Sequence, residues 1–196
     1  MSTDIKTELL QETFLQFLTQ FLLTAGIPAR HQPIDAESSF EYLLIGVLQD
    51  GSETPDWARF YSLNQAMQEQ GTPAIEAYTV LNLDLPLGIQ VPEPYLSKTA
   101  FLLSMINRLL PGPVLLINPD EGLYFSYRFV VVEEDEFWPG LLLESLNLLR
   151  FLIEPVRGSI KALISEQKTI EEAMAYLEKA LATPPADRGP LFSKDA

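Results

Sequence analysis

The chain has 196 residues, no cysteine and a single histidine, His31. Without cysteine it can form neither disulfides nor thiolate zinc sites, and it has no thiol nucleophile. This absence fits a reducing compartment, so we expect a cytoplasmic protein. His31 lies in the polar segment 30–33, which we expect to be a solvated loop, and a lone histidine there does not indicate catalysis or metal binding. We expect no cofactor.

Basic residues are also scarce, since 13 Lys and Arg stand against 27 Asp and Glu, a formal charge of −14. A surface this acidic repels nucleic acids and anionic membranes, so we expect neither as a partner. No long uncharged apolar run predicts a membrane span, and we expect no signal peptide, since residues 1–6 lack a basic start followed by an apolar run. Because the acids are dispersed, we interpret the charge as favouring solubility, with a basic partner segment as the alternative.

The known catalytic motifs are missing as well. There is no glycine-rich phosphate loop, no helical pair of zinc-binding histidines and no serine-hydrolase motif. Carboxylate pairs occur in any acidic chain, and Asp50, Asp84 and Asp120 are the candidates for a metal-dependent enzyme. The acidic run 133–136 is better explained by its place before a helix, where negative charge favours the helix N-terminus. We therefore expect a protein that is not an enzyme, with the carboxylate enzyme as the alternative.

What the chain does have is the composition of a globular protein, with 47% hydrophobic and 10% aromatic residues. Its length suffices for one domain with a core, which we place at residues 1–182. Prolines and a glycine recur after residue 183, so we expect residues 183–196 to be a flexible tail.

The most informative stretch is a predicted β-hairpin over residues 114–132. Asn118 to Gly122 has the composition of a hairpin loop, with Gly122 suited to a left-handed conformation. In the return strand 123–132, side chains alternate between two faces. The odd positions are apolar and predict the core face: Leu123, Phe125, Tyr127, Phe129 and Val131. The even positions are mixed and predict a half-exposed face: Tyr124, Ser126, Arg128, Val130 and Val132.

Hydrophobic periodicity predicts the other elements. We expect helices over 4–25, 93–110, 138–165 and 169–181, and strands over 40–48, 57–63 and 75–85. Residues 64–70 are expected to be a turn or a frayed strand end. Phenylalanines on the first helix are interpreted as core, with an exposed apolar face as the alternative. Pro155 predicts a kink or break in the helix 138–165, and Thr169 with Glu172 predicts a capping box.

The predicted fold is α+β, a twisted antiparallel sheet of about five strands. The order is helix, three strands, helix, two strands, helix, followed by an extra C-terminal helix. In an acidic, cysteine-free chain, this order resembles the type III secretion chaperone-like superfamily, which includes the YbjN-type proteins, over roughly residues 5–165. The resemblance implies a homodimer that binds an extended client segment on a hydrophobic surface without catalysis. It carries no motif, and the helix 169–181 and the tail are additional.

The function we expect is therefore that of a protein-binding module, chaperone-like or regulatory, with a protein client of unknown identity. We expect a homodimer formed through sheet faces or through the helix 93–110. The mixed face of the return strand combines aromatic, arginine and aliphatic side chains, as interface cores do. The candidate protein-binding residues are Tyr124, Arg128, Val130 and Val132.

Overall fold

The computed structural model describes residues 3–34, 38–48, 54–69, 78–110, 112–118, 120–132, 137–165 and 167–182. The expected tail 183–196 and the acidic run 133–136 lie outside them. The elements in chain order are α1 (Thr3–Thr24), β1 (Ala29–Gln32), β2 (Tyr42–Val47), β3 (Asp56–Ser62), α2 (Leu63–Glu69), β4 (Tyr78–Pro86), a 3-10 turn (Glu93–Tyr95), α3 (Leu96–Leu109), β5 (Val114–Asn118), β6 (Gly122–Val132), α4 (Pro139–Ile164) and α5 (Ile170–Ala182).

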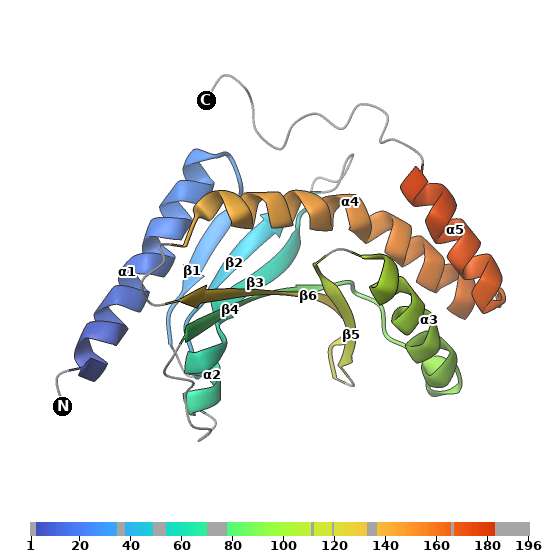
Figure 1. The fold of residues 1–196 in the computed structure, drawn as a ribbon, viewed down its shortest axis with the longest axis horizontal. Helices are drawn as coiled ribbons and strands as arrows, with labels where there is room; N and C mark the ends of the chain where they lie inside the picture. Colours follow the sequence, from blue (N-terminus) through green and yellow to red (C-terminus); the bar gives the residue numbers. More distant parts are fainter. Residues whose placement is uncertain are drawn as a thin grey trace.

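The described strands form one open antiparallel sheet in the order β1-β2-β3-β4-β6-β5 (Figure 1). The α+β class, the antiparallel pairing and the β5–β6 hairpin are confirmed. The strands β2, β3 and β4 form the expected meander. The hairpin joins them because β6 pairs along β4, from Tyr78 opposite Val132 to Pro86 opposite Tyr124. The prediction of about five strands is wrong by one, since the described residues form six.

The additional strand is β1, which we expected to be a solvated loop. Its residues Arg30, His31 and Gln32 show no apolar alternation, so the local pattern gives no strand signal. Pairing with β2 fixes the strand, because the sheet edge satisfies its backbone groups. His31 is accordingly not solvated: its side chain is 17% exposed, and its Nε2 lies 3.5 Å from Oε2 of Glu41.

A second correction concerns residues 63–69, which form the short helix α2 rather than a turn or a frayed strand end. The segment is too short to show helical periodicity, although several of its residues favour helices. Ala66 is buried. The side chain of Asn64 also accepts a hydrogen bond from the backbone N–H of Val80 at 3.0 Å, which holds the start of α2 against β4.

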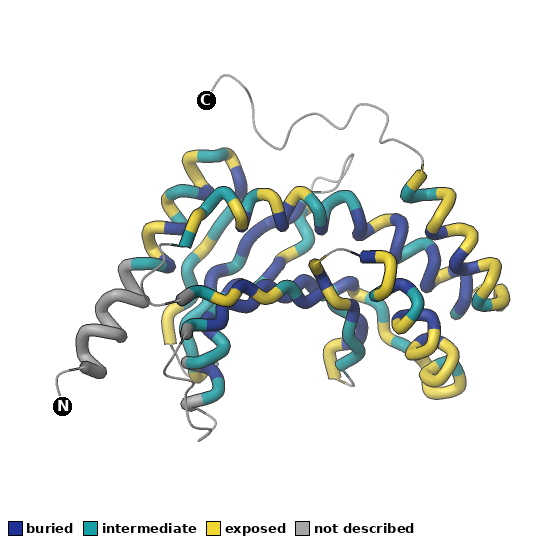
Figure 2. The backbone as a smooth tube through the Cα atoms, viewed as in Figure 1, coloured by how far each residue is buried: buried dark blue, intermediate teal, exposed yellow. Residues whose placement is uncertain are grey.

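One face of the sheet is covered by helices. Figure 1 shows α4 lying across it, with α1 at one end and α3 and α5 at the other. A single cluster of buried apolar residues extends from α1 to α5, and Figure 2 shows the buried positions along the strands and the helices that cover them. The odd positions of β6 belong to this core as predicted: Leu123, Phe125 and Phe129 are buried, and Tyr127 and Val131 pack against them.

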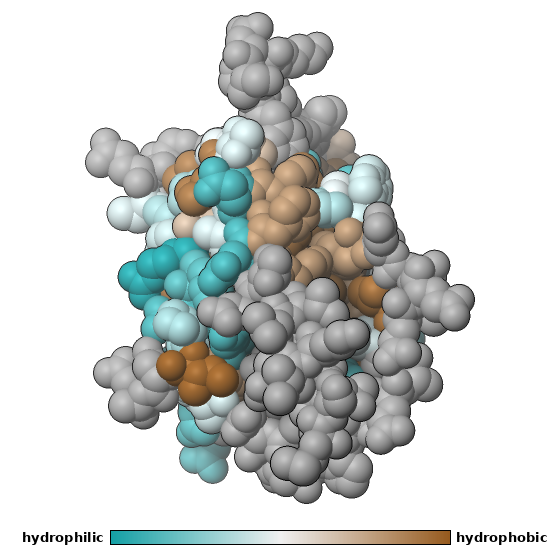
Figure 3. Space-filling model, turned by 90° about the vertical axis from the view of Figure 1, so that its left-hand side faces the viewer, coloured by the Kyte–Doolittle hydropathy of each residue, from teal (hydrophilic) through white to brown (hydrophobic). Residues whose placement is uncertain are grey.

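The phenylalanines of α1 only partly meet the expectation of core residues. Phe14 and Phe21 are half-buried, and the ring of Phe14 contacts that of Phe137 edge-on at 5.7 Å between centroids. Phe17 is 55% exposed and stacks on Phe21. In Figure 3, which views this side of the molecule, brown hydrophobic atoms gather among hydrophilic ones. One side of α1 therefore leaves apolar surface uncovered.

The helix α4 continues through Pro155 as one helix, and Figure 1 shows that it bends partway along its length. Buried residues occur on both sides of the proline, including Ile153 and Val156, so the apolar stripe keeps its contact with the core. A kink without a break agrees with the prediction, since proline removes one backbone hydrogen bond while packing holds the rest.

The C-terminal helix α5 packs against α4 through small side chains. The hydroxyl of Ser159 donates to the carbonyl of Ala173 at 2.8 Å, and the ring of Tyr176 lies directly over Gly158. The predicted capping box is confirmed: the backbone N–H of Thr169 donates to Glu172, and that of Glu172 donates to the Thr169 hydroxyl. Within the described residues, no helix is long and apolar enough to cross a membrane.

Arg157 joins α4 to the sheet. Its guanidinium binds both carboxylate oxygens of Asp56, with N···O distances of 3.0 and 2.7 Å. Its Nε also donates to the carbonyl of Leu87 at 3.0 Å. Burial alone would lower the pKa of Arg157, but hydrogen bonds and charges, first from Asp56 and then from Glu154, raise it above its ordinary value. The residue therefore stays charged and connects three segments.

The outer edge of β5 is occupied by a side chain. The amide of Asn107 on α3 accepts from the backbone N–H of Leu115 at 2.7 Å and donates to its carbonyl at 3.1 Å. Both backbone groups of Leu115 point away from β6, so a neighbouring strand would need them for pairing. The side-chain amide of Asn107 therefore occupies the position that a peptide group of an added strand would take.

Candidate functional site on the open face of the sheet

The open face is the side of the sheet that faces away from α4, and it carries the even positions of β6. The register shows which side chains share it, because directly paired residues point the same way. Arg59 is opposite Asp84, and Asp84 is opposite Ser126. In the next row, Tyr61 is opposite Asn82, which is opposite Arg128. Figure 1 shows α2 on this side at one end of the sheet.

Four of these side chains form a hydrogen-bonded network across three strands. The phenol of Tyr61 donates to Oδ2 of Asp84 at 2.8 Å. The amide nitrogen of Asn82 donates to the Tyr61 oxygen at 3.0 Å and to Oδ1 of Asp84 at 2.7 Å. Ser126 then donates to the Asn82 oxygen at 3.3 Å. Asn82, Asp84 and Ser126 are buried, so the network satisfies polar groups that would otherwise be costly to bury.

The environment of Tyr61 raises its pKa well above the ordinary value for a phenol. Burial is the largest cause, followed by the charge of Asp84 and the hydrogen bond that Asp84 accepts, whereas Asn82 and Arg59 act in the opposite direction. Tyr61 therefore keeps its proton, which holds the carboxylate of Asp84 in place.

This raised pKa predicts a loss of stability at alkaline pH. Above pH ~10, the unfolded chain releases the Tyr61 proton while the folded chain keeps it, so the free energy of unfolding should fall as pH rises, by up to ~1.4 kcal/mol per pH unit. Tyr61→Phe should remove this part of the slope. It should also cost about 1–3 kcal/mol at neutral pH, because one oxygen of Asp84 loses its donor. Urea unfolding between neutral pH and pH 11 measures both effects, and identical alkaline slopes in the two proteins would contradict the assignment.

The open face also gathers the basic side chains of the sheet. All Lys and Arg residues of the described strands, Arg30, Arg59 and Arg128, lie on it by register. Arg59 pairs with Glu121 on the β5–β6 turn. Burial alone would lower the pKa of Arg59, but Glu121 first and then the charge of Asp84 raise it. Arg128 is exposed and has no hydrogen-bonding or ion-pairing partner in the part of the chain that the structure describes.

Of the predicted protein-binding residues of β6, Tyr124, Arg128 and Val130 have described side chains, and the register puts these on the open face. Tyr124 is half-buried, with a pKa raised by burial and then by the charges of Asp84 and Glu121. Val130 is 64% exposed, the highest exposure among the large hydrophobic side chains described. Val132 pairs with Tyr78 through its backbone, and its side chain lies outside the described residues.

Sequence reasoning missed the network beneath these residues. The alternation places Ser126 on the mixed face of β6 but assigns no role to it, to Tyr61 or to Asn82, and Asp84 is predicted only as a metal ligand. A signal was present, because Asn82 and Asp84 alternate in the middle of an otherwise apolar strand. Polar residues two apart in such a strand share one face and need partners there. The partners come from β3 and β6, which no local pattern could identify.

Two of the three carboxylates of the enzyme alternative, Asp84 and Asp120, lie within the described residues, and their surroundings differ. Asp84 belongs to the network, and Asp120 is exposed in the hairpin turn, where its backbone N–H donates to Asn118 at 2.9 Å. Asp50 lies outside the described residues. Within the described ranges, no group of three or more His, Asp or Glu residues is arranged to hold a metal ion.

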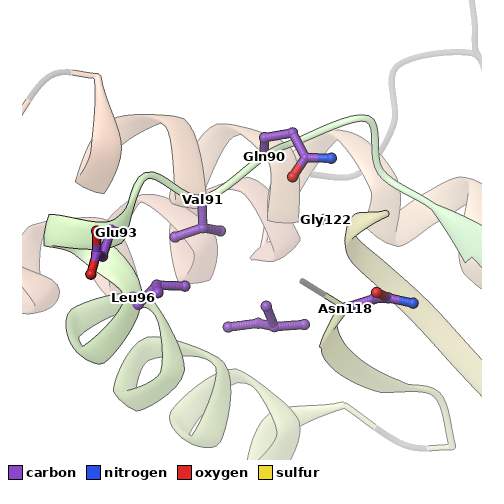
Figure 4. A pocket seen from close by; sticks show the side chains of 7 residues that line it. Gln90, Val91, Glu93, Leu96, Asn118 and Gly122 are labelled. Carbon is purple, nitrogen blue, oxygen red and sulfur yellow. The ribbon is translucent and has the colours of Figure 1, made fainter. Parts of the chain in front are cut away.

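A small cavity of about 210 Å³ lies elsewhere, between α3 and the hairpin (Figure 4). Its walls are mostly apolar, with one carboxylate: it is lined by Gln90, Val91, Glu93, Leu96, Ile117, Asn118 and Gly122. Sites for small molecules are usually larger, on the order of 300–1,000 Å³. The cavity is smaller than this range, so the open face remains the candidate site.

The open face is a surface of paired strands on which charged, aromatic and aliphatic side chains project outward. Such a surface can bind another molecule through several shallow contacts. Comparisons of this chain with protein families, curated proteins and solved structures find no match.

Proposed function

We propose that this protein is a non-enzymatic protein-binding module, chaperone-like or regulatory, that binds a protein client on its open face and acts as a homodimer. The observation that carries the proposal is the exposure of large apolar side chains on this face. Val130 is 64% exposed, and Trp57 and Val114, which share the face by register, are 44% and 43% exposed. Covering such side chains contributes about 1.5–3 kcal/mol for each one fully buried.

The residue types on the face support a protein partner. Tyr, Trp and Arg are enriched among the few residues that dominate the binding energy of measured interfaces. Here Tyr124, Trp57 and Arg128 accompany the aliphatic side chain of Val130. The buried hydrogen bonds of Asn82 hold the strands beneath them, so little order has to be created on binding.

The resemblance to the type III secretion chaperone-like superfamily belongs to the same proposal, as do the cytoplasmic location and the absence of catalysis. The dimer would form through the open face or through α3. Leu96, Phe101 and Leu109 on α3 are exposed and offer a second apolar surface. Two surfaces would allow the protein to bind a second copy and a client at the same time.

Val130→Glu tests this proposal. It places a charge where the client or the second copy would exclude water. If the face binds the client, we expect the variant to lose client capture in a pull-down. If the face binds the second copy, we expect it to lose dimer formation in light scattering. Wild-type protein at micromolar concentration should have twice the single-chain mass of 22.0 kDa. Circular dichroism checks that the variant folds.

The companion variant is Phe101→Glu, which places a charge on α3, the other surface proposed for the dimer. A wild-type mass of 22.0 kDa would rule out the dimer. A folded, dimeric Val130→Glu protein would exclude the open face from the dimer. If that variant also captured the same client as the wild type, the open face would not be the binding surface.

A further inference from the structure

Among the described strand residues, the open face has the opposite charge balance to the whole chain. The whole protein has 27 acidic and 13 basic residues. In the described strands, however, all three basic residues lie on this face: Arg30, Arg59 and Arg128. The two acidic strand residues are Asp56 and Asp84. Asp56 binds Arg157 of α4 on the covered side of the sheet.

Asp84 lies on the open face but does not present its charge outward. It is 8% exposed, and its two oxygens accept hydrogen bonds from Tyr61 and Asn82. Glu121 at the hairpin turn is the acid nearest to Arg59, and the two form an ion pair. Arg128 therefore remains as an exposed charge without a counterion among the described residues.

We propose that the open face binds an acidic, extended segment of a partner protein, with carboxylates at Arg128 and Arg59. The inference rests on the proposed function and names the chemistry of its client. Arg128 supplies a free guanidinium, whose five donors match a carboxylate. The side chain of Arg59 is 35% exposed and is held by Glu121, so it can receive a second carboxylate from the solvent side.

The spacing of the two arginines suits an extended segment. Arg59 on β3 and Arg128 on β6 are separated by β4, so their strands lie about 10 Å apart. The register offsets them by two residues along the strands, or about 7 Å. The backbone distance is therefore roughly 12 Å, which three or four residues of an extended chain cover. Acidic residues at that interval could reach both guanidinium groups.

Apolar and aromatic groups beside the arginines would contact the residues that flank the acids. Phe40 packs on Tyr61 and Tyr42, with ring centroids 5.1 and 6.1 Å apart. Trp57 and Val130 are exposed on the same face. The surface therefore favours a segment with both acidic and apolar residues over a purely charged one.

Single-stranded RNA is the competing ligand, because aromatic and arginine side chains on a sheet can also bind bases and phosphates. The net charge of −14 argues against it, since a long polyanion is repelled by the whole protein. A short acidic segment carries few charges and also buries apolar surface. The weaker charge repulsion and the burial of apolar surface both favour the protein segment over RNA.

Fluorescence anisotropy at low salt tests the proposal with three labelled probes. The first is a twelve-residue peptide that repeats the order Glu, Val, Thr. The second has Lys in place of every Glu. The third is a twelve-nucleotide oligouridylate. We expect the Glu peptide to bind at least ten times more tightly than the other two, and added salt to weaken its binding. Arg128→Glu should reduce this affinity at least tenfold. The control Arg108→Glu, on the exposed end of α3, should leave it unchanged.

Several results would overturn the inference: no binding of the Glu peptide, equal binding of the Lys peptide, preference for the RNA, or no effect of Arg128→Glu. Self-association abolished by Arg128→Glu, without peptide binding, would assign the face to a second copy instead. The two proposals can fail separately. If Val130→Glu abolishes client capture while Arg128→Glu does not, the protein-binding function stands and the acidic segment is excluded.

Discussion

Replacing Gly122 with alanine should lower the free energy of unfolding by about 3 kcal/mol, because two penalties add. Gly122 begins β6 with a φ of +83°, a left-handed conformation that costs a residue with a side chain about 1–2 kcal/mol. An added Cβ would also collide with the carbonyl oxygen of Ile89. That oxygen accepts the backbone N–H of Leu123 at 3.0 Å, so it cannot move without losing the bond. Urea denaturation measures the loss.

Gly88→Ala is the matched control for this prediction. Gly88 also has a positive φ, of +66°, but an added Cβ would have no atom within 4 Å. Its loss should therefore reflect the backbone conformation alone, about 1 kcal/mol. Equal losses in the two variants would show that the contact with Ile89 contributes nothing.

Arg157→Ala should also destabilise the protein strongly, by about 2–4 kcal/mol. The side chains of Arg157 and Asp56 are 16% and 26% exposed, so removal of the guanidinium leaves a carboxylate that water only partly solvates. The carbonyl of Leu87 loses its donor as well. The loss can be read from thermal and urea unfolding.

Arg157→Lys distinguishes geometry from charge at this position. A lysine keeps the positive charge but cannot bind both oxygens of Asp56 and reach Leu87 at once, so it should recover less than half of the loss. Arg108→Ala, at an exposed position in the last turn of α3, is the control and should change stability by about 0.5 kcal/mol or less. A lysine variant as stable as the wild type would show that charge alone suffices.

The parts of the fold that sequence predicted were those with local patterns. The alternation in β6 identified its core face and its exposed face, and Gly122 identified the hairpin turn. Thr169 and Glu172 identified the start of α5. In each case the residues that determine the structure lie within a few positions of one another, so the pattern is visible in the chain.

The parts that sequence missed depend on distant partners. The strand β1 exists because β2 offers its edge, and nothing in Arg30, His31 and Gln32 indicates that. The polar network is similar, because Tyr61, Asn82 and Ser126 come from three strands whose register sets their contacts. The outer residues of the candidate site could therefore be predicted from the alternation in β6. The buried network beneath them could not, because it depends on the pairing of distant strands.

The Asn107 amide has a consequence for how this protein behaves among other chains. An uncovered strand edge is a template that recruits foreign strands, which leads to domain swapping and aggregation. At Leu115, the backbone groups that would start such growth are already bonded within the chain, at 2.7 and 3.1 Å. An amide supplies both a donor and an acceptor there, whereas a carboxylate lacks the donor. Asn107 thus opposes the addition of a further strand at this point of β5.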